Sequence, residues 1–296
     1  MSTTATAAPS TGAARTASSS APARGRRRTG RVWGLLAWAA GLIAIIPILW
    51  MVLTSLHSEI DAANNPPAIA ARLTLDGYRN FFSSDAQPWP ALINSLTASV
   101  LSTLLVLALA TPAAYALSIK PVERWTDVLF FFLSTKFLPI VAGLLPLYLF
   151  ANKTGTLDNI GLLIVLYTSM NLPIAVWMMR SFLAEVPREM LEAAALDGAG
   201  FFNTITRVIA PIALPGVAAT SLICFIFSWN ELMLARTLTA TIAGTAPVFL
   251  TSFVTSQGLF IAQLCAASVV ISIPVLVAGF AAQDKLVQGL SLGAVK

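Results

Sequence analysis

The sequence predicts an all-α integral membrane protein with six membrane-spanning helices. Of its 296 residues, 57% are hydrophobic and only 10% are charged, whereas soluble proteins carry roughly 25% charged residues. Runs of about 20 apolar residues are long enough to cross a ~30 Å hydrocarbon core as helices. Such runs cover residues 33–56, 91–118, 128–150, 160–179, 214–235 and 262–282. Because backbone groups in lipid must be paired within the segment, and no alternating strands occur, we expect helices.

The first 31 residues differ from the rest of the chain. They are rich in Ala, Ser, Thr and Pro and hold six arginines, a composition that cannot form a core and predicts a disordered basic tail at 1–31. The apolar run that follows is too long for the 7–15-residue core of a signal peptide. We therefore expect a retained first helix at 32–57 and an outer loop at 58–90. A basic tail can also attract nucleic acid, but beside a membrane span it is better explained as a determinant of topology, so no nucleic-acid partner is expected.

The positions of the basic residues predict the orientation. If both termini are cytoplasmic, 13 of the 18 Lys and Arg residues fall on cytoplasmic segments and four on outer segments, with Lys136 inside a span. The cytoplasmic set is Arg15, Arg24, Arg26, Arg27, Arg28, Arg31, Lys120, Arg124, Arg180, Arg188, Arg207, Lys285 and Lys296, and the outer set is Arg72, Arg79, Lys153 and Arg236. The positive-inside rule then places residues 185–213 in the cytoplasm.

The residues needed for an enzyme are missing from the sequence. His57 is the single histidine and has no HExxH context, and Cys224 and Cys265 fall within spans without a CxxC pair. No lysine follows a glycine, so a Walker A phosphate loop is impossible. We expect no catalytic residue, no metal site and no cofactor on this chain. If nucleotide energy is used, another subunit supplies it.

Residues 185–200, EVPREMLEAAALDGAG, predict a short helix on the cytoplasmic side. Pro187 suits the first turn of a helix, and Gly198 suits a left-handed ending. Three consecutive alanines leave the backbone open to close approach, while Glu192 and Asp197 are available to charged partners. The alternative is an interfacial helix lying on lipid, but such helices carry bulky apolar residues opposite Lys and Arg. A small, acidic helix favours a groove on a partner protein.

This stretch resembles the EAA loop of ABC-importer permeases. The segment EAAALDGAG…RVIAPIALPG matches its pattern at Glu192, Ala193, Ala194, Gly198 and Pro211, with a Val and an Ala where the pattern has Ile and Leu. Further similarities are LINSL (92–96), SWNEL (228–232) and the ending GLSLGAVK, and together they cover residues 90–296. They are typical of maltose-type second permease subunits for carbohydrates. STKFLPIVAGLLPLY (134–148) and AAQDKLVQGLSLGAVK are most similar to the branch that imports sugar alcohols.

The resemblance implies a type I ABC-importer permease fold, with a permease core at 91–282 and a coupling loop at 185–213. It also implies a place in the plasma membrane of a bacterial cell. It also implies four partners: a homologous second permease subunit, an ATPase dimer that binds ATP and Mg, an extracytoplasmic substrate-binding protein and a small carbohydrate substrate. The coupling helix would dock on the ATPase. Gly198 would allow the bend, the alanines a close fit and Glu192 a polar anchor, and the C-terminal tail 283–296 would also reach the ATPase.

Polar residues within spans are candidates for the substrate pathway. Trp229, Asn230 and Glu231 combine an aromatic face with hydrogen-bonding groups, as a sugar requires; the alternative is an aromatic belt with Glu231 facing water. Lys136 carries a charge that costs about 2.5–3.5 kcal/mol within a span. Its distance along the helices argues against a direct pair with Glu231. Asn94 is a further candidate, unless it only holds helices together.

A stand-alone ion-coupled secondary transporter is the rival interpretation. It would favour repeated halves and acidic residues in mid-span, and the sequence shows no repeat and only Glu231 near such a position. A membrane-embedded hydrolase lacks the residues it would need. In the importer interpretation, the loops at 57–90 and 236–260 face the binding protein.

Overall fold

The computed structural model describes residues 25–64, 71–83, 87–119, 122–255 and 258–293. The chain divides into two compact units, Met1–Leu49 and Trp50–Lys296. In the first unit the described part is helical and belongs to α1 (Gly25–Ser55). This helix begins within the segment expected to be disordered, because Arg is a good helix former and extending an existing helix is easier than nucleating one. The tail before residue 25 lies outside the described residues.

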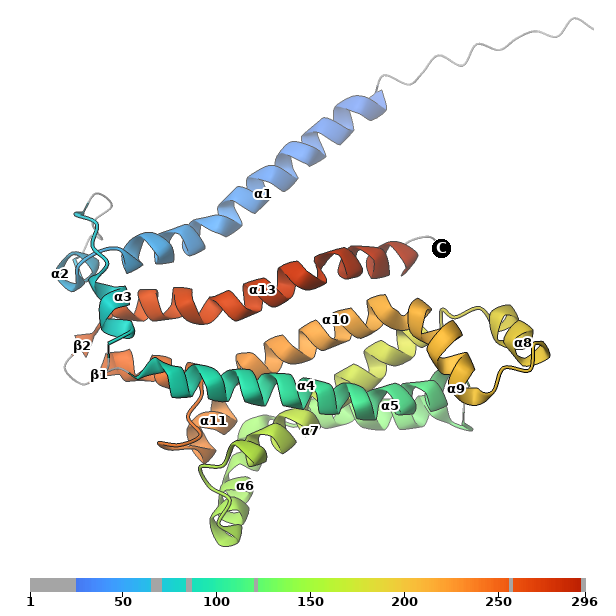
Figure 1. Cartoon of the computed structure of the whole chain (residues 1–296). Coiled ribbons are helices and arrows are strands. Elements are labelled where there is room, and N and C mark those ends of the chain that lie inside the picture. The colour runs from blue at the N-terminus through green and yellow to red at the C-terminus, as the bar shows by residue number, and fades with distance from the viewer. Residues whose placement is uncertain (1–24, 65–70, 84–86, 120–121, 256–257, 294–296) are drawn as a thin grey trace, which may run out of the picture. The chain divides into compact units, whose positions relative to one another are not determined.

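Four long helices form the centre of the second unit (Figure 1). They are α4 (Pro88–Ser118), α7 (Ile160–Leu183), α10 (Ala210–Trp229) and α13 (Ile261–Gly293). Helix α10 contacts the other three, and α4 packs along α7. All four are long and apolar enough to span a membrane, as is α1 from Val32 to Ser55. Helix α13 continues past the predicted end of the sixth span, so most of the expected tail at 283–296 is helical.

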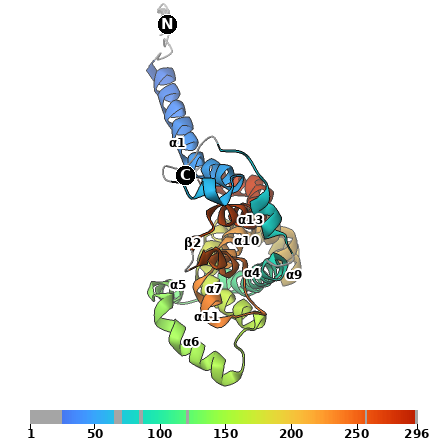
Figure 2. The ribbon, with the colours of Figure 1, turned by 90° about the vertical axis from the view of Figure 1, so that its left-hand side faces the viewer.

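The third predicted span is not one helix. It is divided into α5 (Trp125–Ser134), η1 (Thr135–Phe137) and α6 (Ile140–Thr154), and the two halves meet at an angle of 83°. Pro139 explains the break, because proline disfavours the helical conformation of the residue before it, and Leu138 is extended, with ψ 123°. Figure 2 shows α6 leaving the direction of the bundle. Five helices are therefore candidate spans in the described chain, or six if the bent pair counts as one.

Short elements connect the long helices. They are α2 (Glu59–Ala62), α3 (Asp76–Phe81), α8 (Arg188–Leu196), α9 (Phe201–Asn203), the π-helix η2 (Thr204–Ile209), α11 (Met233–Leu238), α12 (Ala246–Leu250), η3 (Thr251–Phe253), β1 (Val254–Thr255) and β2 (Gly258–Leu259). The two strands are antiparallel, with Val254 opposite Leu259. Helices α8 and α9 lie at one end of α10, and α3 and the strands lie toward the other (Figure 1).

The core between α4, α7 and α10 consists of small and branched residues that allow the helices to approach closely. We call the following buried set the central cluster: Val106, Ala110, Ala114, Leu117, Ala175, Val176, Met179, Leu183, Ile209, Ala213 and Cys224. Hydrogen bonds add to this packing. The Ser228 hydroxyl of α10 lies 3.0 Å from the Ser102 hydroxyl of α4, and it accepts a 2.9 Å hydrogen bond from the Asn171 amide of α7.

Candidate functional site

The segment 185–213, called the elbow below, contains α8, α9 and η2. Helix α8 ends as the sequence predicts: Gly198 has φ +73°, its N–H donates to the Ala195 carbonyl at 3.1 Å, and the Ala199 N–H donates to the Ala194 carbonyl at 2.9 Å. This pair of hydrogen bonds is a Schellman ending, which needs a left-handed residue. Pro187 lies one position earlier than expected, at the N-cap of α8.

The chain leaves the elbow through a π-helix. The Ala210 N–H donates to the Ile205 carbonyl, five residues earlier. Pro211 explains this widened turn, because a proline has no N–H and its ring clashes with the carbonyl four residues before it. A π-turn relieves the clash without ending the helix, and such turns are frequent at functional sites.

Helix α8 has an inner and an outer face. On the inner face, Ala194 is buried and Leu191 packs against the central cluster. On the outer face, Glu192, Ala193 and Asp197 are exposed. The expected alanine surface is therefore split: Ala193 is open to a partner, whereas Ala194 fits α8 onto its own bundle. The physical reason is that neighbouring helical residues point about 100° apart.

Sequence reasoning missed the exposed apolar residues of the elbow. Leu196 is 89% exposed, Phe202 is 76% exposed and Met190 is 45% exposed. Met190 and Leu196 belong to α8 and Phe202 to α9, and exposed large apolar residues within one short segment favour an interaction site. The sequence did show two consecutive phenylalanines after GAG. The end of a helix, however, does not reveal which of the following side chains the rest of the fold leaves exposed.

The same end of the bundle holds a half-buried cationic contact. The Arg180 guanidinium of α7 lies 3.9 Å from the centre of the Trp125 ring of α5. Such a cation–π contact satisfies a charge without an acidic partner. It fixes the start of α5 to α7 next to the elbow.

Lys136 lies in η1, at the break between α5 and α6, rather than within a continuous span. It lines a cavity of about 490 Å³ together with residues of α6 and α7, among them Ile140, Ser169 and Pro173. Among the described residues, the ion pairs are Arg79–Asp76 and Arg124–Asp127. Lys136 and Glu231 thus form no direct pair, in agreement with the expectation.

Trp229, Asn230 and Glu231 do not converge on one open site. The Trp229 indole is buried, donates to the Ile271 carbonyl at 3.2 Å and stacks on Phe225. The Glu231 carboxylate is also buried and accepts two free N–H groups in the first turn of α11, from Leu234 at 3.0 Å and Ala235 at 3.2 Å. Asn230 is exposed, and its amide donates to a carbonyl in the preceding turn.

Asn94 connects α4 to a distant loop. Its amide donates to the carbonyls of Ile242 at 2.7 Å and Gly244 at 3.0 Å. This geometry agrees with the alternative in which Asn94 holds segments together.

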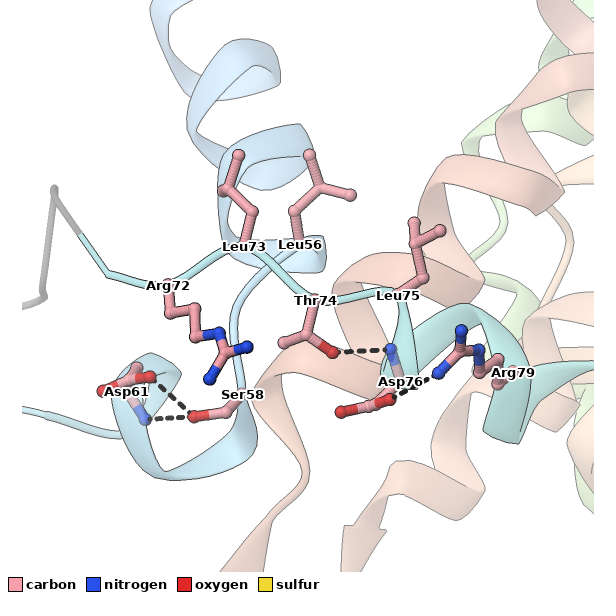
Figure 3. A pocket seen from close by; sticks show the side chains of 9 residues that line it. All are labelled: Leu56, Ser58, Asp61, Arg72, Leu73, Thr74, Leu75, Asp76 and Arg79. Atoms are coloured by element: carbon pink, nitrogen blue, oxygen red, sulfur yellow. Dashed lines mark hydrogen bonds and ion pairs between the residues drawn. The ribbon is translucent and has the colours of Figure 1, made fainter.

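A wider cavity of about 840 Å³ lies in the segment after α1 (Figure 3). Its walls carry both signs of charge: Asp61 accepts a hydrogen bond from Ser58 at 2.7 Å, and Asp76 pairs with Arg79 at 3.4 Å. Arg72 extends its guanidinium toward Ser58. Across the described residues, no group of three or more His, Cys, Asp or Glu side chains is placed to hold a metal ion.

Comparison with known proteins identifies the family. Residues 91–291 match the family described as binding-protein-dependent transport system inner membrane component. The chain is 35% identical to a probable ABC transporter permease protein, y4oR, of Sinorhizobium fredii, over 90% of this chain and 95% of the relative. It is 32% identical to the trehalose transport system permease protein SugB of Mycobacterium tuberculosis, over 91% of this chain and 98% of the relative.

A solved structure has the same fold. It is a bacterial ABC transporter involved in import of the acidic polysaccharide alginate, with a TM-score of 0.70 at 22% identity, over 89% of this chain and 98% of that chain. The type I importer permease fold predicted from the sequence is therefore confirmed, and the rival secondary transporter is set aside. Subunits of this family are not themselves enzymes. The chain belongs to the binding-protein-dependent transport system inner membrane components, the permease subunits of ABC importers.

Proposed function

We propose that the chain forms half of the translocation pathway of a carbohydrate importer. The proposal is supported by relatives named for sugars: the trehalose permease above, and a trehalose/maltose permease of Thermococcus litoralis that is 30% identical over 86% of this chain. Another relative, from Agrobacterium fabrum, is named for sulfoquinovosyl glycerol and is 30% identical over 85% of this chain. Within this class we favour a sugar alcohol, on the segments 134–148 and 281–296.

The elbow faces the cytoplasm and docks on an ATPase dimer that binds ATP and Mg. Both termini lie on the same side, in accord with the 13-to-4 distribution of basic residues. A homologous permease completes the pathway, and an extracytoplasmic binding protein delivers the substrate to the opposite end. The charged cavity after α1 lies in the loop proposed to face that protein.

The single observation that carries the coupling role is the two-faced character of α8. Glu192, Ala193 and Asp197 form the contact with the ATPase, while Ala194, Gly198 and Pro211 give the elbow its shape. Leu191 and Ile205 pack against the central cluster. Because a packed core transmits strain rather than absorbing it, a displacement of α8 reaches α4, α7 and α10 through these two side chains.

Substrate passes near the break between α5 and α6. Lys136 lines a cavity there and Asn230 is exposed, so these two side chains are proposed to contact the substrate. Trp229 and Glu231 support the pathway from behind, because they are buried. Asn94 does the same, because its amide already donates to two loop carbonyls.

The test is purification of the tagged protein in mild detergent, with mass spectrometry of the associated chains, followed by ATP-driven uptake in vesicles. We expect an ATPase, a second permease and a binding protein, and uptake of polyols or disaccharides that requires ATP. Glu192→Lys should lower uptake at least tenfold while the chain is still made, since it reverses a contact charge; Glu123→Lys, on a different segment, is the control. A lone chain that is active with an ion gradient and no ATP would contradict the proposal.

A further inference from the structure

Asp158, a half-buried acidic residue, makes an unusual set of contacts. It lies in the turn between α6 and α7 and has a left-handed backbone, with φ 55°. Its carboxylate accepts four consecutive backbone N–H groups from a loop about 80 residues later in the chain: Ala240 and Ala243 at 2.8 Å each, Thr241 at 3.0 Å and Ile242 at 2.9 Å. In return the Asp158 N–H donates to the Leu238 carbonyl at 2.8 Å.

The loop at 239–245, called the clasped loop below, is also held from a second side. The Asn94 amide donates to two of its carbonyls, at Ile242 and Gly244. The neighbouring Ser95 hydroxyl accepts the N–H of Ala246 at 2.8 Å. The carbonyls of this short loop therefore bind to α4, and its N–H groups bind to the turn between α6 and α7.

The charge of Asp158 strengthens these contacts. Partial burial acts to raise the pKa of its carboxyl, but the four N–H groups act to lower it, and the net effect is a lowered pKa. The carboxylate is consequently charged at neutral and mildly acidic pH. Its contribution is complete above the ordinary Asp pKa and is lost only as the pH falls through the lowered value.

The side chain at the apex of the clasped loop is uncovered. Ile242 is 76% exposed, although surface loops with no regular structure are usually mobile and polar. The backbone of the clasped loop is fixed, while the apolar side chain at its apex is exposed to solvent. Such a loop is preorganised, so it loses little conformational entropy when a partner binds. The loop lies between α11 and α12, in the connection from α10 to α13, at the end of α10 away from the elbow.

We propose that Asp158 is a positioning residue for transport: it holds the clasped loop, with Ile242 at its apex, in the one shape that allows productive docking of the extracytoplasmic binding protein. This inference rests on the proposed function. Asp158 itself does not touch the substrate. It acts through the backbone of the loop, and sequence reasoning did not single it out.

The experiment compares wild type, Asp158→Asn and Asp127→Asn in the complete importer, reconstituted with its binding protein and ATPase. An asparagine offers one acceptor oxygen and turns the other position into a donor that faces N–H groups. Asp127→Asn removes an acid of α5 whose partner, Arg124, is exposed, and it lies outside the loops proposed to face the binding protein, so it is the matched loss of charge. For Asp158→Asn we expect the half-saturating concentration of binding protein, in ATPase stimulation, to rise about tenfold or more, with ATPase activity in the absence of binding protein retained. Asp127→Asn should behave as wild type.

Amide hydrogen exchange of residues 240–243 gives a readout that does not depend on transport. In wild type these amides should be protected despite the exposure of the loop, and in Asp158→Asn they should exchange at least tenfold faster. Unprotected wild-type amides would overturn the proposal even if the variant failed to assemble, and so would an unchanged response to the binding protein. If wild type itself shows no ATP-driven uptake, the proposed function fails; normal wild-type uptake with an indifferent variant removes only the role of Asp158.

Discussion

The two ends of the bundle are held by different forces. At the elbow, packing makes the attachment: Leu191 of α8 and Ile205 of η2 pack against the central cluster, and Ala194 is buried. Within the described residues, α8 makes no side-chain hydrogen bond or ion pair to the bundle. Its acidic outer face remains available to a partner.

At the opposite end, carboxylates hold backbone N–H groups. Asp158 binds the clasped loop, Glu231 caps α11, and Glu59 accepts the N–H groups of Ala262 at 3.1 Å and Gln263 at 2.8 Å where α13 begins. Hydrogen bonds to charged groups are directional and about twice as strong as neutral ones. This end is therefore fixed in shape.

The difference matches the two tasks proposed for the chain. An element that must follow an ATPase needs a contact that can shift as a unit, which packing on one face allows. A surface that must recognise a docking protein needs a constant shape, which directional hydrogen bonds give. Variants can test this comparison. A change in packing should have its largest effect on the elbow, and the loss of a carboxylate should have its largest effect on the opposite end of the bundle.

The largest effect is expected at Gly216 of α10. A β-carbon there would collide with the Phe182 side chain of α7. Gly216→Val should lower the stability of the permease by about 3 kcal/mol or more, the upper end of what overpacking costs, because the collision involves the base of the Phe182 side chain. This should appear as a lower unfolding temperature in detergent and as weaker coupling of ATP hydrolysis to uptake. Gly279→Val is the control, because a β-carbon at Gly279 meets nothing within 4 Å; equal effects of both variants would contradict a special approach of α7 and α10.

A smaller effect is expected when α11 loses its cap. Glu231→Ala leaves the N–H groups of Leu234 and Ala235 without an acceptor in a buried place. An unpaired buried group costs about 1–3 kcal/mol, and because the short α11 can relax, the net loss of stability should be about 2 kcal/mol. Glu231→Gln keeps one acceptor oxygen and should fall between Ala and wild type. Thermal unfolding and uptake measure this order, and full activity of the Ala variant would show that the cap is dispensable.

The smallest effect on stability is expected at Gly198. Nothing lies within 4 Å of an added β-carbon, so the strain comes only from φ +73°. Gly198→Ala should cost about 1–2 kcal/mol locally, and Gly198→Asn less, because Asn tolerates the left-handed conformation. Uptake per ATP hydrolysed should fall in the same order while the amount of assembled complex stays unchanged. If Gly198→Ala and Gly198→Asn gave the same uptake per ATP hydrolysed, the left-handed ending of α8 would not control coupling.

Several features of the chain were visible in the sequence because they depend on local interactions. The apolar runs predicted the helices, and Gly198 predicted the end of α8, since a left-handed turn is decided within a few residues. The third span was predicted wrongly as one helix. Pro139 was present, but the high hydropathy on both sides of it masked a break that bends the chain by 83°.

The site residues divide in the same way. The exposure of Glu192 could be expected from a short acidic helix, but the inward position of Ala194 required the bundle on which α8 lies. Trp229 donates to a carbonyl 42 residues away, and Asp158 binds amides 82 to 85 residues away. No short sequence pattern predicts hydrogen-bond partners so far apart in the chain, and a single Asp in a turn is indistinguishable in the sequence from an ordinary surface residue.

Hydropathy and charge are properties of single residues, so the sequence by itself determined that this chain spans a membrane and in which orientation we expect it to do so. Its motifs were sufficient to indicate the permease family to which it belongs. The tertiary structure decided which polar side chains are already paired within the chain and which remain open. The reason is that a hydrogen bond depends on distances of about 3 Å between atoms, and only the packing of α4, α7, α10 and α13 brings segments so far apart in sequence within that range.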